Sequence, residues 1–138
     1  MFDQDYPGKG KKLGIIGVPL GFGAGMHLID MGYEVHEVND LDLPRPIDES
    51  TEHPKYLAEM RISIEKIIPA IKEILTAGEL PIILGGDHSI ALPTFSAIQS
   101  FYRVKNQEVG LLWFDAHADM NTPDTSPSGN LHGMPLAH

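Results

Sequence analysis

Short apolar runs separated by polar or glycine-rich segments predict the strands of this chain. Residues 13–18 (LGIIGV), 81–84 (PIIL) and 109–114 (VGLLWF) are continuous apolar runs. Such runs are typical of strands that are buried on both faces of a parallel sheet. Residues 33–38 (YEVHEV) alternate between apolar and polar positions, which indicates a half-exposed strand such as an edge strand. The pattern therefore predicts four strands.

Two helices are predicted between these strands. From residue 54 to residue 77, apolar side chains recur at helical spacing and form one stripe. Pro69 lies inside this stretch and is expected to kink or divide the helix. A second helix is expected from Ser89, as the N-cap, to about residue 103, with Pro93 tolerated in its first turn.

The alternation of strands and helices along the chain argues for an α/β fold. Its sheet should be mainly parallel and covered by helices. In such sheets, functional residues gather at the carboxyl ends of the strands. A length of 138 residues is close to that of one domain, so we expect a single domain over residues 1–138.

Polar side chains follow two of the apolar runs. Asp115, His117 and Asp119 come directly after the third run, and His88 follows the second. In an extended chain, side chains at positions i, i+2 and i+4 point to one face, so the first three residues would form half of a metal site. Mixed carboxylate and imidazole ligands suit Mn, Zn or Fe better than Ca or Mg. A hydrogen-bonded polar cluster without a metal is the alternative interpretation.

Charge and composition narrow the class of protein. The formal net charge is −9 and the basic residues are scattered, which argues against nucleic acid as a partner. The sequence contains no cysteine, which excludes disulfides and thiolate metal sites. No apolar run approaches the roughly 18 residues of a membrane span, and the N-terminus has no signal-peptide pattern. We therefore expect a soluble, cytoplasmic protein that does not bind membranes.

A polar loop follows Asp119 and contains Asn121, Ser128, Asn130 and His132. Amide and hydroxyl groups suit hydrogen bonds to the carboxylate or amino group of a small substrate. Ordinary turn chemistry explains the same composition. His132 has the chemistry of a proton shuttle near neutral pH, but an isolated histidine is more often a packing or capping residue.

Three motifs together resemble the ureohydrolases, and specifically the arginase family. They are GGDHS at residues 85–89, DAHAD at residues 115–119 and SGNLHG at residues 128–133. GVPLGFGAG near the N-terminus also resembles the first strand and loop of that family. The resemblance implies a three-layer α/β/α sandwich with a mainly parallel sheet. It also implies a Mn²⁺-dependent enzyme, with two ions per site, that hydrolyses L-arginine to L-ornithine and urea through a metal-bridging hydroxide.

The resemblance also implies the roles of individual residues. His88, Asp115, His117 and Asp119 match metal ligands of the family, and His132 matches the histidine that is proposed to relay protons.

A further set matches the residues that contact the α-carboxylate of the substrate: Asn121, Ser128, Gly129 and Asn130. These contacts would favour arginine over agmatine, which lacks a carboxylate. An agmatinase, or another ureohydrolase acting on a guanidino compound, is the alternative enzyme.

The chain departs from the family pattern in two places. The family's later Asp-x-Asp pair, which completes the two-metal shell, and a downstream Glu have no counterpart in the 138 residues. The family also has a longer segment near Gly25 and Met26. We therefore expect an N-terminal, partial ureohydrolase domain, and a truncated, inactive metal-binding remnant is a further alternative. The resemblance suggests a homo-oligomer, either a trimer or a hexamer.

Overall fold

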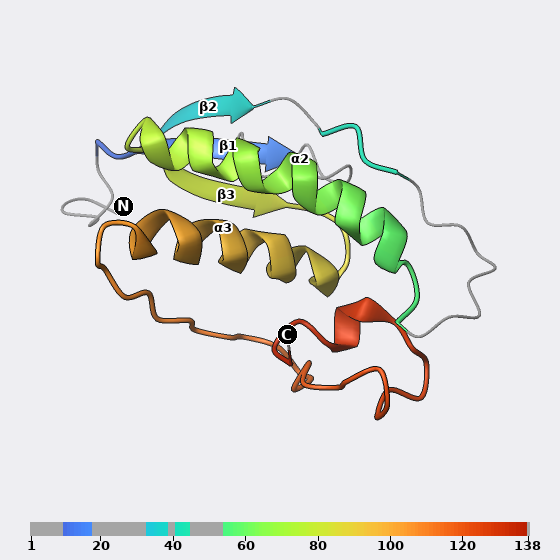
Figure 1. The fold of residues 1–138 in the computed structure, drawn as a ribbon. Coiled ribbons are helices and arrows are strands. Elements are labelled where there is room, and N and C mark those ends of the chain that lie inside the picture. The colour runs from blue at the N-terminus through green and yellow to red at the C-terminus, as the bar shows by residue number, and fades with distance from the viewer. Residues whose placement is uncertain (1–9, 18–32, 39–40, 45–53, 138) are drawn as a thin grey trace, which may run out of the picture.

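The computed structural model describes residues 10–17, 33–38, 41–44 and 54–137. Within these residues, strands and helices alternate as the sequence predicts (Figure 1). In chain order, the elements are β1 (Lys12–Gly17), β2 (Glu34–Val38), α2 (Leu57–Thr76), β3 (Leu80–Leu84), the 3₁₀ helix η1 (His88–Ile90), α3 (Ala91–Arg103) and the 3₁₀ helix η2 (Leu131–Gly133).

The strands form one parallel sheet with the order β2–β1–β3. Leu13 of β1 is in register with Val35 of β2 on one side and with Leu80 of β3 on the other. The central position of β1 agrees with its continuous apolar sequence, and residues 13–16 are buried. The alternating strand β2 lies at the edge, as predicted. Three of the four expected strands are thus confirmed, and so is the parallel sheet.

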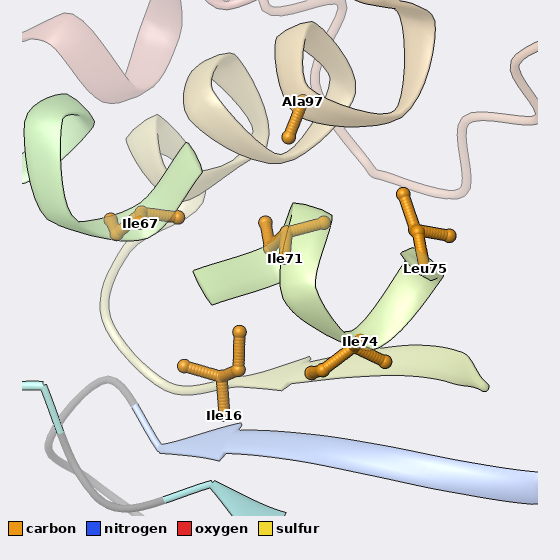
Figure 2. Close-up of a cluster of buried hydrophobic side chains, with 6 residues drawn as sticks. All are labelled: Ile16, Ile67, Ile71, Ile74, Leu75 and Ala97. Carbon is orange, nitrogen blue, oxygen red and sulfur yellow. The ribbon is translucent and has the colours of Figure 1, made fainter. Parts of the chain in front are cut away.

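Helix α2 covers one face of this sheet. Its buried stripe includes Ile67, Ile71 and Ile74, which pack against Ile16 of β1 (Figure 2). Pro69 lies inside the helix, yet α2 continues without interruption to Thr76, so the expected division of the helix does not occur. No helix in the described segments is both long and apolar enough to cross a bilayer.

Helix α3 packs beside α2 over the same face of the sheet (Figures 1 and 2). Ala97 is fully buried in the shared core, where its small side chain allows close approach of the two helices. Pro93 lies in the first turn of α3, as expected. The predicted cap is wrong, because Asp87 rather than Ser89 precedes the first helical turn. The Asp87 carboxylate accepts the backbone N–H of Ser89 at 3.0 Å.

The expected fourth strand, residues 109–114, is wrong for the described structure. This segment contains no strand and pairs with none of the described strands. Leu112 and Phe114 within it are 82% and 90% exposed. In Figure 1 the segment runs past α3, apart from β3. An apolar sequence favours a strand, but a strand also needs a neighbour with free N–H and C=O groups, and no described strand lies beside this segment.

Candidate metal centre

The first part of the centre follows β3. Gly85 and Gly86 have φ values of 107° and 72°, a backbone conformation that is unfavourable for residues with a Cβ. This double-glycine turn allows the chain to leave the sheet and begin η1 directly at His88. The histidine is therefore placed at the carboxyl end of a parallel strand, where α/β proteins commonly bind their ligands.

The second part is a bend between Asp115 and Asp119. Asp115 Oδ1 accepts the backbone N–H of His117 at 2.6 Å, which turns the chain. Asp119 has a φ of 49°, in the left-handed region that Asp tolerates better than most residues. The chain is therefore not extended here, and the expectation that Asp115, His117 and Asp119 share one face is wrong.

Three ligand atoms converge between these two parts. His88 Nδ1 lies 2.6 Å from Asp115 Oδ2 and 2.9 Å from Asp119 Oδ2. One ligand atom from each residue lies within 4.8 Å of the others, as a shared metal ion requires. His117 is not in this group, and its side chain is 82% exposed. The structure thus brings together three of the four residues that the resemblance implies as ligands.

The geometry of Asp119 shows how well these residues fit a cation. Its side chain is only 6% exposed, and Oδ2 is buried without a hydrogen-bond partner among the described residues. A buried carboxylate oxygen without a partner is costly. His88 Nδ1 carries at most one proton, so the two nearby carboxylates would have to share a single N–H donor. A divalent cation would satisfy all three ligand atoms at once, so the donor set fits a metal ion.

Asp115 faces in two directions. Its Oδ2 is near His88 and its Oδ1 lies 3.1 Å from His117 Nδ1. A carboxylate with one oxygen near each histidine would be available as a ligand beside either imidazole. The hydrogen bond from the His117 backbone N–H lowers the pKa of Asp115 below its usual 3.8, and the side chains of His117 and His88 act in the same direction. Asp115 is therefore ionised, as a metal ligand must be.

His132, the expected proton relay, lies outside the three-residue cluster. It is in η2, which packs against η1. Its Nδ1 is 3.4 Å from Asp87 Oδ2. Asp87 thus caps η1 and pairs with His132. The sequence motifs gave no role to this aspartate, although its position immediately before His88 is the signal that indicates one.

The expected substrate-binding residues line the loop before η2. The Asn121 backbone N–H donates to the Gly133 carbonyl at 3.0 Å, which brings the two ends of this loop together. Ser128 Oγ accepts the backbone N–H of Asn130 at 3.2 Å. Gly129 is buried, and its carbonyl accepts the backbone N–H of Lys55 at 2.8 Å. Part of this polar chemistry therefore stabilises the turn, which was the alternative explanation of its composition.

Trp113 is a second residue at this site that the sequence motifs did not indicate. Its ring stacks on the His88 ring with a centroid separation of 4.4 Å and an interplanar angle of 19°. Its Nε1 is buried without a hydrogen-bond partner among the described residues. An apolar run predicts a strand position for such a residue, and nothing in that pattern identifies contact with a histidine 25 positions earlier.

A parallel sheet with a carboxylate–imidazole cluster beyond its strands defines an α/β protein with a site suited to a transition metal. The particular family follows from sequence comparison. A sequence model of the Arginase family matches residues 14–138, and the chain belongs to that family.

Individual relatives agree with this assignment. The chain is 40% identical over 146 residues to an arginase from Brevibacillus brevis and 35% identical over 144 residues to one from Bacillus subtilis strain 168. Each comparison covers 92% of this chain and 47% of the relative. The chain thus spans about half the length of the curated relatives it matches and corresponds to their N-terminal portion.

Solved structures show the same fold. An arginase from Bacillus caldovelox matches with a TM-score of 0.80 at 32% identity, over 92% of this chain and 48% of that structure. An arginase from Entamoeba histolytica in complex with L-ornithine matches with a TM-score of 0.78 at 31% identity, over 94% of this chain and 49% of that structure. The predicted arginase-like α/β class is therefore confirmed.

Proposed function

We propose that this chain carries the first half of the active site of a Mn²⁺-dependent arginase. The reaction consumes L-arginine and water and yields L-ornithine and urea. Membership of the arginase family supports the reaction class. The cluster formed by His88, Asp115 and Asp119 supports a metal-dependent mechanism. We also propose that the protein is cytoplasmic and, as the resemblance implies, that it forms a homo-oligomer.

The observation that carries this proposal is the buried oxygen of Asp119. Asp119 Oδ2 lies 2.9 Å from His88 Nδ1 but makes no hydrogen bond within the described structure. A cluster that served only to stabilise the fold would satisfy this oxygen with a donor. A divalent cation would satisfy this oxygen together with His88 Nδ1 and Asp115 Oδ2.

Each residue of the site would have its own role in the hydrolysis. A divalent ion held by the cluster would lower the pKa of water and thereby supply a nucleophile at neutral pH. Asp115, with one oxygen near His88 and the other near His117, would hold both imidazole rings in place beside the ion. His132 would transfer a proton to the departing ornithine nitrogen as its bond to the guanidinium carbon breaks. Asp87, whose Oδ2 lies 3.4 Å from His132 Nδ1, would orient the imidazole ring.

The proposed substrate contacts would favour an amino acid as the substrate. Asn121 Oδ1 accepts from Thr125 Oγ1 at 3.4 Å, and the Asn121 amide nitrogen makes no hydrogen bond to the described residues. An amide N–H₂ is a suitable donor to an α-carboxylate. Ser128 and Asn130 lie on the same loop and would complete this contact. Agmatine, which has no carboxylate, would lose these hydrogen bonds.

Mn²⁺ binding by the purified chain tests the metal centre. Binding is measured as the decrease of the electron paramagnetic resonance signal of free Mn²⁺. We expect Asp119→Asn to abolish binding, so that this signal does not decrease. The matched control is Asp124→Asn, which changes an exposed aspartate of the same loop. Equal binding by both variants, or no binding by the native chain, would reject the metal centre.

Urea release tests the reaction. We expect the Mn²⁺-loaded chain to release urea from L-arginine and to release much less from agmatine. Mn²⁺ binding without urea from either substrate would leave the metal centre in place but reject hydrolysis by this chain. Equal urea from both substrates would reject the proposed role of Asn121, Ser128 and Asn130.

A further inference from the structure

The single tryptophan of the chain lies against the candidate metal centre. The rings of Trp113 and His88 stack at a centroid distance of 4.4 Å and an angle of 19°. We propose that Trp113 is a positioning residue, which holds the His88 ring so that Nδ1 points at Asp115 and Asp119. This inference rests on the metal centre proposed above and adds the residue that orients one of its ligands.

His88 needs such a support. A histidine that binds a metal is normally oriented by a hydrogen bond from its other ring nitrogen to a carboxylate, a carbonyl or water. In the described part of the chain, His88 Nε2 makes no hydrogen bond, and the polar contacts of the ring are those of Nδ1 with the two aspartates. The side chain is also 37% exposed, so packing on all sides does not restrain it. The face of Trp113 therefore provides the restraint that a hydrogen bond usually provides.

The position of Trp113 in the chain strengthens this argument. Its neighbours Leu112 and Phe114 are 82% and 90% exposed, whereas Trp113 is half-buried with a fully buried Nε1. In an extended segment, alternate side chains point in opposite directions, so the segment turns this one side chain toward η1. Trp113 precedes Asp115 by two residues. The stack and the ligands consequently connect the same two segments, one that follows β3 and one that carries the aspartates.

Two substitutions of Trp113 distinguish the loss of ring stacking from a general loss of folded protein. We expect Trp113→Leu to weaken Mn²⁺ binding by roughly threefold to tenfold, which corresponds to the usual value of one aromatic pair. Trp113→Phe keeps an aromatic face and should bind within about twofold of the native chain by the same reasoning. Phe114→Leu is the matched control, because it removes an exposed aromatic ring from the adjacent position and should not change binding.

The affinities are measured by calorimetric titration with MnCl₂, and far-UV circular dichroism confirms that each variant is folded. In the native chain, tryptophan emission reports on Trp113 alone and should change with the same Mn²⁺ midpoint. His88→Ala should abolish that change.

The outcomes are distinguishable. Native-like affinity in Trp113→Leu, or an equal loss in Trp113→Leu and Trp113→Phe, would overturn the positioning role while leaving the metal centre intact. No Mn²⁺ binding by the native chain would overturn the metal centre and this inference with it.

Discussion

The contact between β1 and α2 is close enough to be tested with one methyl group. Gly14 lies in the buried part of β1, directly beneath Ile74 of α2. A Cβ at position 14 would lie 2.5 Å from Ile74 Cγ2 and 2.7 Å from both Cγ1 and Cδ1. These distances are far shorter than the ~3.5–4.0 Å of an ordinary carbon–carbon contact. Gly14→Ala should therefore destabilise the fold.

The size of the effect depends on whether Ile74 can move. It is 2% exposed and packs in the core, and a β-branched side chain in a helix has essentially one favourable rotamer. Rotation away from the new methyl group is therefore blocked, and α2 must shift instead. Overpacking of this kind costs about 1–3 kcal/mol. A loss of about 2 kcal/mol would lower Tm by roughly 8 °C in a domain of this size.

Thermal unfolding followed by far-UV circular dichroism measures this loss. Gly110→Ala is the matched control, because a Cβ at position 110 meets nothing within 4 Å. Ile74→Ala removes all three contacted atoms, so the double variant with Gly14→Ala should be more stable than the sum of the two single losses predicts. A Tm for Gly14→Ala that equals that of Gly110→Ala would refute the reasoning.

Three further predictions follow from burial and charge. Ile71 is a fully buried residue of α2, and Ile71→Ala should lower the free energy of unfolding in a urea titration by about 2–5 kcal/mol. Ile62 is half-exposed on the same helix, and Ile62→Ala should lower it by less than about 1 kcal/mol. Equal losses would contradict the packing described. Without metal, Asp119→Asn should leave Tm unchanged or raise it, because it removes one of two neighbouring negative charges while His88 Nδ1 keeps Asp115 Oδ2 as a partner, and a marked fall in Tm would argue for a structural role instead. Replacement of Leu112 and Phe114 by Ser should reduce concentration-dependent association in light scattering while changing stability by less than about 1 kcal/mol, and unchanged association would show that this exposed apolar pair is not the cause.

Local chemistry made much of the fold predictable. The apolar runs identified β1 and β3, and the alternation of residues 33–38 identified an edge strand, because each pattern reflects which faces of a strand are buried. The helical spacing likewise located α2 to within a few residues of its ends. The strand predicted at residues 109–114 was wrong because local sequence was not sufficient there. Their sequence suits a strand, but strand formation depends on a partner that lies elsewhere in the chain.

The chemistry of the candidate site could also be predicted from the sequence. The residue types and their places after two apolar runs were enough to suggest a carboxylate–imidazole metal site at the carboxyl ends of strands, since ligand chemistry belongs to the side chains themselves. The motifs further indicated the arginase family, which the comparisons confirm.

The tertiary structure decided which of these groups meet. It joins His88 to Asp115 and Asp119, directs His117 to the opposite oxygen of Asp115, and stacks Trp113 on His88. Spacing in the sequence could not show this, because the bend after Asp115 breaks the two-residue periodicity on which the prediction depended. Distances between segments that are far apart in the chain are set by how β3, η1 and the aspartate loop pack together. The sequence alone therefore determined the chemistry of the site, and the packing of the fold determined its geometry.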